Sequence, residues 1–410
     1  MVITDHHTPP AQLPSAYAII NPKCEHKDNS VFLAGVGVAY KFIYHLYKEY
    51  RNFDLMQSKK YLELVAIGTI TDVVPLFGDN RIFVRNGIEK LNRETSLGIH
   101  YLLEKMGNGR INTVTIGYGI GPRINAAGRL DSASVGIELL MTKDRHKAKE
   151  MALELNNLNE RRKKEGEKIF LEATKIIEDN EELLTRKVLV LSSEEWEPGV
   201  IGIVTSQMAK HYERPAVLIT TKGQISRGSI RSFSGINIFM ALEKCKELLI
   251  SYGGHKEAAG FEISSENIGK FKEKYSQLLD EYLEGENLYT TIKIDYELKL
   301  EDVNNELLKD INKLEPYGEG NREPIFITKN LNAIDYCLVG KEKTHLRVLF
   351  IKDEEQIEGI GYKMAHFLSV LSEYTTFDVI YNLEENNFNG QKKLQFKIVD
   401  LKPSNSGLDD

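Results

Sequence analysis

The stretch Val2-Ile3-Thr4-Asp5-His6-His7 sets a carboxylate and two imidazoles directly after three residues of high β-strand propensity. A strand here carries Asp5, His6 and His7 to the carboxyl edge of a sheet, where open α/β folds bind their ligands. Imidazole and carboxylate ligands suit Mn²⁺, and a mainly oxygen set suits Mg²⁺. Because adjacent side chains on a strand point to opposite faces, a complete site needs further acidic residues from elsewhere. A frayed terminus with a chance histidine pair explains these residues equally well.

The composition is typical of a globular protein, since 41% of the 410 residues are hydrophobic and 28% are charged. The length predicts about two to four domains. No apolar run approaches the ~20 residues of a membrane span, and no signal-like segment opens the chain. Three widely separated cysteines favour reduced thiols and a cytoplasmic location. The net charge of −7 excludes wrapping of nucleic acid by the whole surface but allows binding in a local basic groove.

The first region contains an aspartate within an apolar setting. Residues 31–47 predict a helix, and Tyr40 stands where a dinucleotide fingerprint needs glycine, so that motif is rejected. Asp72 lies in the apolar stretch 61–76, where a carboxylate is costly to bury unless it is paired or bound to a metal. A helix cap is the alternative interpretation of Asp72.

Residues 121–131 (GPRINAAGRLD) predict an irregular segment in which small residues, Asn125 and the two arginines Arg123 and Arg129 approach phosphates closely. A plain loop whose arginines pair with carboxylates is the competing interpretation. Residues 143–179 follow with helical spacing of apolar positions and predict one helix of roughly 50 Å that bridges two domains. Its basic run, 161–164, is typical of a solvated face, although it could line a groove for a polyanion.

A third region alternates strands and helices. Residues 187–191 and 216–220 predict buried strands, and a helix starts near Pro198. Two clusters, 226–232 (SRGSIRS) and 253–260 (GGHKEAAG), combine bare backbone donors, hydroxyls and positive charge, which is the chemistry of a phosphate cradle. Simple turns are the alternative for each cluster.

The last region changes to β-structure. Strands are predicted at residues 291–298, 345–350, 377–383 and 394–399, with a hairpin turn at Asn389-Gly390. Short strands joined by turns predict a small barrel of the oligonucleotide-binding (OB) type. The polar end of the chain, 404–410, is predicted to be a disordered tail.

Taken together, seven motifs resemble the RecJ family of the DHH phosphoesterase superfamily, and they occur in the family's order along nearly the whole chain. They are VITDHH (2–7), GTITDVVPL (68–76), GPRINAAGRLD (121–131), EPGVIGIVTSQMA (197–209), RGSIRS (227–232), GGHKEAAGF (253–261) and LEPYGEGNREPIF (314–326). The resemblance implies an α/β protein with an incomplete DHH phosphoesterase domain (1–142), a long connecting helix (143–182), an α/β DHH-associated domain that holds nucleic acid (183–287) and a C-terminal OB-fold β-barrel (288–403).

The resemblance also implies roles for individual residues. Asp5, His6 and Asp72 resemble metal ligands, and His6, His7 and Asp72 resemble catalytic residues, with His7 contacting the scissile phosphate. The implied substrate-binding residues are His7, Asn125, Arg129, Ser229, Arg231, Ser232, Gly253, Gly254, His255 and Lys256. The implied cofactor is Mn²⁺ or Mg²⁺, and the implied partner is single-stranded DNA, with a single-strand-binding protein or a helicase as further candidates and no membrane.

The sequence departs from the family pattern at its start. The family places an Asp-x-Asp pair and a further aspartate well before the His-His motif, which begins here at residue 5. A two-metal site needs enough oxygen ligands to hold two ions about 3.5–4 Å apart. We therefore expect an N-terminally truncated chain with an incomplete metal site and impaired hydrolysis.

Three functions follow as hypotheses. The first is a single-stranded-DNA-specific 5′→3′ exonuclease that hydrolyses phosphodiesters in DNA recombination and repair. The second is a catalytically inactive protein that binds single-stranded nucleic acid or acts as a scaffold. The third is a phosphodiesterase acting on short oligonucleotides or cyclic dinucleotides, against which the predicted barrel argues, because tiny substrates need no extended platform.

Overall fold

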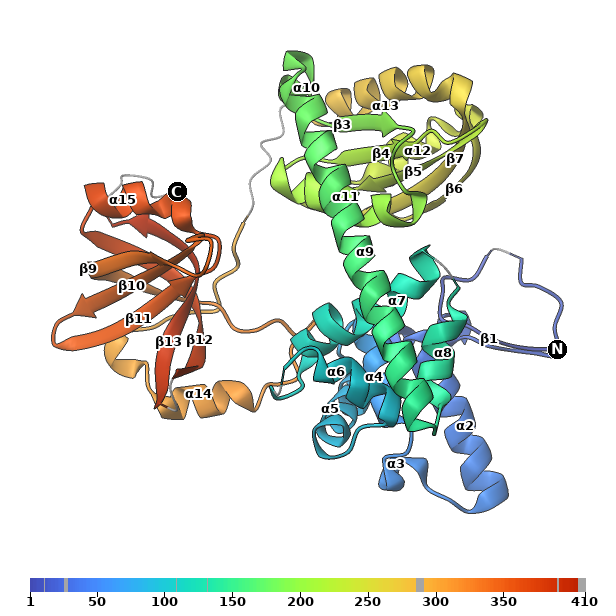
Figure 1. Ribbon diagram of the computed structural model, residues 1–410, viewed down its shortest axis with the longest axis horizontal. Helices are drawn as coiled ribbons and strands as arrows, with labels where there is room; N and C mark the ends of the chain where they lie inside the picture. The colour runs from blue at the N-terminus through green and yellow to red at the C-terminus, as the bar shows by residue number, and fades with distance from the viewer. Residues whose placement is uncertain are drawn as a thin grey trace. The chain divides into compact units, whose positions relative to one another are not determined.

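The computed structural model describes residues 1–10, 12–25, 29–107, 109–130, 132–284, 291–388 and 391–404 (Figure 1). The chain divides into two compact units. Unit 1 comprises Met1–Arg93, Ile111–Ile116 and Ile292–Asp410, and unit 2 comprises Glu94–Arg110 and Gly117–Thr291. The predicted Asn389-Gly390 turn, and the predicted tail beyond Ser404, lie outside the described residues. Among the described residues, no helix combines the length and apolar character that a membrane crossing requires.

The amino-terminal part of unit 1 is a two-stranded parallel sheet with helices. Strand β1 (Val2–Thr4) confirms the strand predicted before Asp5, and it pairs with β2 (Ala18–Ile20). The helices are α1 (Pro22–Glu25), α2 (Gly35–Arg51), α3 (Leu55–Ser58), α4 (Leu62–Thr71) and α5 (Gly78–Arg93), with a 3₁₀ turn at Asn29–Phe32. Helices α4 and α5 pack so closely that a Cβ at Gly87 would lie 2.3 Å from the Leu62 carbonyl oxygen. Glycine is therefore required at position 87 so that α5 can pack against α4, the helix that ends at Asp72.

The carboxyl-terminal part of unit 1 is a closed barrel. Its strands are β8 (Tyr296–Glu297), β9 (Phe326–Val339), β10 (His345–Lys352), β11 (Glu355–Gly361), β12 (Thr376–Phe388) and β13 (Gln391–Pro403). The order is β10-β11-β13-β12-β9-β8, and β10 also pairs with β9, which closes the ring. Phe350, Phe377 and Phe396 are buried in its core. Helices α14 (Asn305–Asn312) and α15 (Leu368–Glu373) complete the barrel domain.

A turn between α14 and β9 is attached to the loop after α4. The backbone amide of Leu76 donates to the Glu319 carbonyl at 2.8 Å. The Arg81 guanidinium donates to the carbonyls of Leu314 and Glu315, the latter at 3.2 Å. The two sequence motifs 68–76 and 314–326 therefore form one packed unit although more than two hundred residues separate them.

Unit 2 begins with a group of helices, α6 (Leu97–Glu104), α7 (Gly121–Leu130) and α8 (Ser134–Met141), that pack on the long helix α9 (Arg145–Glu178). Helix α9 confirms the predicted long helix (Figure 1). The irregular segment predicted at 121–131 was wrong, because residues 121–130 form α7. Its glycines suggested a loop, but Ala126 and Ala127 are fully buried, and Pro122 occupies the start of the helix, where no donor is needed.

A five-stranded mixed sheet forms the rest of unit 2. Its strands are β3 (Leu189–Ser193), β4 (Ala216–Thr220), β5 (Ile225–Arg231), β6 (Leu249–Gly254) and β7 (Ala258–Ser264), in the order β3-β4-β5-β7-β6. One core packs α11 (Pro198–His211) and the end of α9 on one face, and a second core packs α12 (Ile238–Glu243) and α13 (Ile268–Tyr282) on the other. A short α10 (Glu181–Thr185) follows α9. The predicted strand 216–220 and the helix starting at Pro198 are confirmed.

Candidate functional site

The end of strand β1 positions the Asp5-His6-His7 segment. The Asp5 amide donates to the carbonyl of Ile20, the last residue of β2, at 3.1 Å. The side chain of Asn21, directly after β2, donates to the His7 carbonyl at 2.9 Å. The two parallel strands therefore fix the segment at their shared carboxyl edge.

His6 and Asp72 lie together in unit 1. His6 Nδ1 is 3.6 Å from Asp72 Oδ2, and the His6 side chain is only 17% exposed. Asp72 is the C-cap of α4, and Val73 after it has a φ of 56°, an uncommon conformation for a β-branched residue. A Cβ at Gly35 would lie 3.2 Å from the His6 ring, so the first turn of α2 supports the imidazole. Asp72 therefore stands at the C-terminal end of α4 with its carboxylate near His6, and its role as a metal ligand stays a prediction.

Asp5 and His7 form a separate pair. His7 Nδ1 lies 2.8 Å from Asp5 Oδ1, and the same oxygen accepts from the backbone amides of His6 and His7 at 2.7 and 3.2 Å. The side-chain bond from His7, followed by the backbone bonds, lowers the pKa of Asp5 to about 2. Asp5 is therefore a carboxylate whose Oδ1 is occupied by three donors.

The described residues do not fit a two-metal centre. Among them, no group of three or more histidine, cysteine, aspartate or glutamate side chains lies close enough together to hold an ion. His6 and Asp72 supply two donor side chains, and the Asp5 carboxylate is bonded to the His7 ring and to the backbone amides of His6 and His7. A centre that holds two ions about 3.5–4 Å apart needs more ligands than this pair supplies.

In unit 2, Arg231 is the centre of a polar cluster at the end of β5. Its Nε donates to Ser206 Oγ of α11 at 3.1 Å, and Nη1 donates to Ser229 Oγ at 3.0 Å. A Cβ at Gly202 would be only 3.4 Å from both Arg231 and Ser229, so glycine lets α11 approach β5. Burial, and then the charge of Arg129, lower the pKa of Arg231. The guanidinium stays charged but is poorly hydrated, as suits a phosphate ligand.

Arg129, on α7, also contacts α11. Its Nη1 donates to the carbonyl of Gly199 at 3.2 Å, and a Cβ at Gly199 would lie 2.1 Å from the Arg129 carbonyl oxygen. Asn125, one turn earlier on α7, is also exposed. The other arginine of this motif, Arg123, is half-buried and donates to Asn156 and to the Gly119 carbonyl at 2.6 and 2.9 Å. Arg129 is therefore the arginine of the motif that is available to a ligand, while Arg123 holds the helices together.

The 253–256 cluster lies on the hairpin between β6 and β7. Ser229 pairs in register with Gly260, and Gly260 pairs with Gly253, so the three residues form a row on one face of the sheet. A Cβ at Gly253 would meet nothing within 4 Å, which leaves this end of the row open. Gly254, the last residue of β6, has a φ of 145°, a backbone conformation that residues with a side chain rarely adopt. The row offers a bare backbone surface beside Arg231.

Three further predicted residues have other contacts. The His255 amide donates to the Ala258 carbonyl at 2.9 Å, which closes the hairpin. Lys256 is exposed and lies 3.9 Å from Glu257. The hydroxyl of Ser232 donates to the Ile236 carbonyl at 2.6 Å and so stabilises its own loop. Sequence reasoning missed Ser206 and Gly202, whose i, i+4 spacing on the helix predicted after Pro198 could have placed them on one face.

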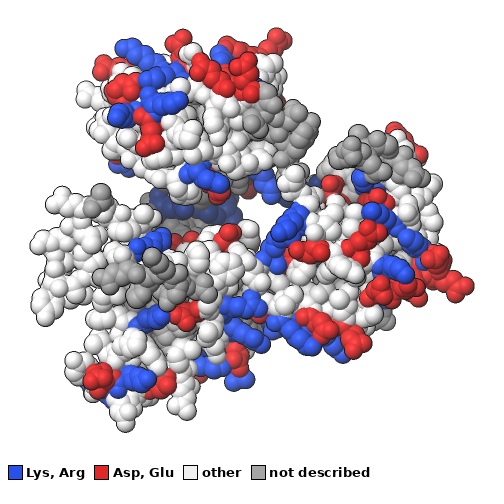
Figure 2. All heavy atoms as spheres, turned by 180° about the vertical axis from the view of Figure 1, so that it is seen from behind, with Lys and Arg blue, Asp and Glu red and all other residues white. Residues whose placement is uncertain are grey.

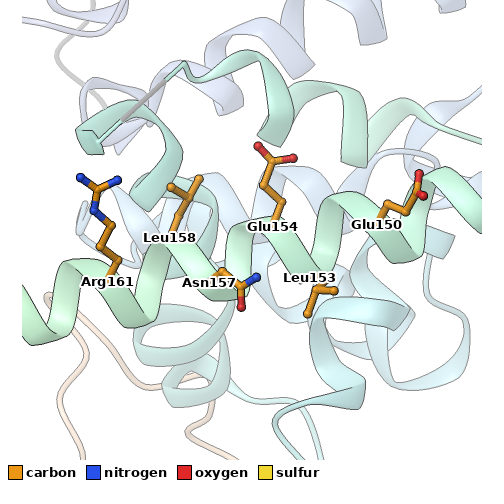
Figure 3. Close-up of a pocket in the computed structure, with 6 residues that line it drawn as sticks. All are labelled: Glu150, Leu153, Glu154, Asn157, Leu158 and Arg161. Atoms are coloured by element: carbon orange, nitrogen blue, oxygen red, sulfur yellow. The ribbon is translucent and has the colours of Figure 1, made fainter.

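Charge on the barrel is mixed. In the view of Figure 2, basic and acidic side chains alternate over the barrel. Lys397 lies 3.6 Å from Glu323, Lys392 lies 2.8 Å from Glu385, and Arg347 pairs with Glu358. A separate hollow of about 460 Å³ runs along the exposed side of α9 (Figure 3) and is lined by Glu150, Leu153, Glu154, Asn157, Leu158 and Arg161. Since one helix supplies its whole lining, this hollow is not part of the candidate site.

Three family models match the chain. They are the DHH family N-terminal domain over residues 1–69, the DHHA1 domain over 185–281 and the RecJ OB domain over 294–400. With the closed barrel and the α/β sheet, these matches confirm the fold class expected from the sequence.

Curated relatives match 98% of the chain. The single-stranded-DNA-specific exonuclease RecJ of Bacillus subtilis is 32% identical, and the protein of the same name from Haemophilus influenzae is 33% identical. The chain spans 50% of the first and 73% of the second. The crystal structure of RecJ in complex with Mn²⁺ from Thermus thermophilus matches with a TM-score of 0.84 at 29% identity, over 98% of this chain and 58% of that one. The complex of that protein with Mg²⁺ matches with a TM-score of 0.80 at 29% identity, over 98% of this chain and 60% of that one.

Proposed function

This chain belongs to the RecJ family, and we propose on that premise that it binds single-stranded DNA and degrades it from the 5′ end by metal-dependent hydrolysis. The observation that carries the proposal is the 33% identity with the Haemophilus influenzae exonuclease over 98% of the chain. The proximity of His6 and Asp72, at 3.6 Å, supports it. The proposed setting is DNA recombination and repair in the cytoplasm, with a single-strand-binding protein or a helicase as candidate partners.

The proposed binding chemistry rests on the polar cluster of unit 2. Arg231, held by Ser206 and Ser229, and Arg129, at the end of α7, offer guanidinium donors to the phosphate backbone. The open row of Gly253 and Gly260 offers backbone to a strand that passes beside them. Asn125, Ser232, Gly254, His255 and Lys256 remain proposed contacts.

The proposed metal residues of this chain are His6 and Asp72, with Asp5 and His7 beside them. Manganese or magnesium is the proposed cofactor, because the matched Thermus structures are complexes with these ions. Since the described donors do not make up a two-metal centre, no hydrolytic step is assigned to them. His7, with its ring held by Asp5, is the proposed contact to the phosphate.

A second candidate function is binding of single-stranded nucleic acid without hydrolysis. The specific observation in its favour is that the described residues contain no cluster of three metal-ligating side chains. This function would need only the polar cluster of unit 2 and the barrel.

The test incubates the purified full chain with 5′-labelled single-stranded DNA and Mn²⁺, beside His6→Ala and Asp72→Asn variants. Release of labelled mononucleotides that both variants abolish would support the nuclease. Tight binding with no release would reject hydrolysis by this chain and support the second function. Failure to bind would reject both.

A further inference from the structure

Strand β3 is an edge strand of the sheet in unit 2. Among the described residues, it pairs with β4 alone. The amide of Leu189 donates to the Pro215 carbonyl at 2.9 Å, so the odd-numbered residues of β3 form the bonds to β4. Successive residues of a strand direct their backbone groups to opposite edges. The amides and carbonyls of Val190 and Ser192 therefore face the unpaired edge.

The unpaired edge forms the floor of a groove. A cavity of about 500 Å³ lies along it, within the size range of ligand sites in proteins. The end of α9 and the short α10 supply one wall, and α13 supplies the other. The first wall includes Ile176 and Leu183, the second includes Lys272 and Ser276, and the floor includes Val190 and Ser192.

Two bonds join the walls at the end where β3 begins. Arg186 Nη1 lies 3.2 Å from Asp280 Oδ2 of α13, and Lys187 Nζ donates to the Leu283 carbonyl at 2.6 Å. The five residues of β3 extend from there for roughly 16 Å. The groove is therefore closed at one end, and its floor matches the length of a short extended peptide.

Strand β3 lacks the features by which folded proteins usually protect an edge. Its sequence, Leu-Val-Leu-Ser-Ser, contains no charged residue and no proline, and no bulge interrupts its register with β4. Proteins normally cover or charge an edge strand, because its free backbone groups can pair with another chain. An unprotected edge at the floor of a groove is the geometry that binds peptides by strand addition.

The positive charge available in the groove is that of Lys272. Burial lowers the pKa of Lys272, and no described carboxylate forms an ion pair with its ammonium group. Arg186, by contrast, is already paired with Glu182 and Asp280. An acidic side chain that entered the groove would therefore pair with Lys272 without displacing an existing partner.

We propose that this groove binds an extended segment of a partner protein by strand addition to β3, and that acidic and apolar side chains alternate in that segment. Successive side chains of an added strand point to opposite walls. The acidic ones meet Lys272 and Ser276, and the apolar ones meet Ile176 and Leu183. Because β6 is the other edge strand, the groove lies at the opposite edge of the sheet from Gly253.

The first experiment measures binding of a fluorescently labelled peptide, Glu-Val-Glu-Val-Glu-amide, to the full chain. Its counterpart with lysine in place of glutamate should bind at least tenfold more weakly. K272E should weaken binding of the acidic peptide at least tenfold and strengthen binding of the lysine peptide.

K270E is the matched control, because Lys270 is exposed on the same helix and is not among the residues that line the groove. It should change the affinity for the acidic peptide less than twofold. Equal losses in K272E and K270E, or no saturable binding of the acidic peptide, would overturn the proposal.

Backbone pairing is tested with the unchanged protein. In an added strand, alternate amides face β3 and the others face away from it. Of two acidic peptides, N-methylated at every glutamate or at every valine, one should therefore lose binding at least tenfold and the other should keep it. The unmethylated peptide should slow hydrogen exchange at the Val190 and Ser192 amides. Equal effects of the two methylation patterns, unchanged exchange at both amides, or displacement of the peptide by single-stranded DNA would each rule out strand addition.

Discussion

The amide of Leu76 and the carbonyl of Glu319 are joined by a 2.8 Å hydrogen bond, which ties the loop after Asp72 to the turn before β9. The side chains of Leu76 and Phe77 also pack closely against this turn. A Cβ at Gly318 would lie 2.8 Å from Leu76 Cδ1, and a Cβ at Gly320, whose φ is 73°, would lie 2.8 Å from the Phe77 ring. The position of Asp72 therefore depends on a segment far away in the sequence.

Arg81→Ala should loosen this junction. The variant loses the guanidinium bonds to the carbonyls of Leu314 and Glu315, and each such bond contributes about 1 kcal/mol. We expect faster hydrogen exchange at the Leu76 amide and lower resistance of unit 1 to urea. The control is Arg85→Ala, one turn later on α5. Equal exchange rates in the two variants would contradict the predicted role of Arg81.

Gly199→Ala should separate α7 from α11. The added methyl group would lie 2.1 Å from the Arg129 carbonyl oxygen, and such overpacking costs about 1–3 kcal/mol. Both the stability of unit 2 and its affinity for single-stranded DNA should fall. Gly269→Ala in α13 is the control, because a Cβ there meets nothing within 4 Å. That change should stabilise the helix by about 0.5–1 kcal/mol, and a loss of stability in it would contradict the packing argument.

His7→Ala should raise the pKa of Asp5 from about 2 towards the ordinary value of 3.8. A depressed carboxyl pKa means that the interaction stabilises the fold above about pH 4 and loses this contribution as the pH falls through about 2. The Asp5 and His7 side chains are largely exposed, so the effect on stability should be small. NMR titration of the Asp5 carboxyl carbon measures the shift. His6→Ala retains its backbone donor and should leave the Asp5 pKa low, and a rise there would point to a different cause.

Cys245 should resist thiol reagents in the folded protein. Burial raises its pKa to about 11, so at pH 8 the group remains a neutral thiol inside unit 2. A chromogenic disulfide reagent should react with the partly exposed Cys24 and Cys337 first, and with a third thiol only after unfolding. Cys245→Ala should leave the rapid phase unchanged. A smaller rapid phase in that variant would show that Cys245 is accessible.

Local sequence patterns predicted much of this fold. The strand before Asp5 was predicted from its β-strand propensity, the strand 216–220 from a short apolar run, and the helix of 34 residues from the helical spacing of its apolar positions. Residues 121–130 were wrongly predicted to be irregular because of their glycines. The burial of Ala126 and Ala127, which favours the helix, cannot be predicted from a local pattern. Tertiary packing overrides propensity in such cases.

Less of the candidate site than of the fold could be predicted from the sequence. The approach of His6 to Asp72 spans 66 positions of sequence, and only the family resemblance suggested it. Ser206 accepts a hydrogen bond from Arg231. Nothing in the sequence of its helix predicts this contact, which depends on the packing of α11 against β5.

The chain contains one tryptophan, Trp196, whose indole is fully buried in unit 2 and donates to Glu172 at 3.1 Å. Its intrinsic fluorescence will therefore follow the melting of unit 2, while unit 1 contributes no tryptophan emission. Circular dichroism records the helices and strands of both. Comparing the two signals in one titration will reveal whether the halves of the molecule melt as one cooperative body or in succession.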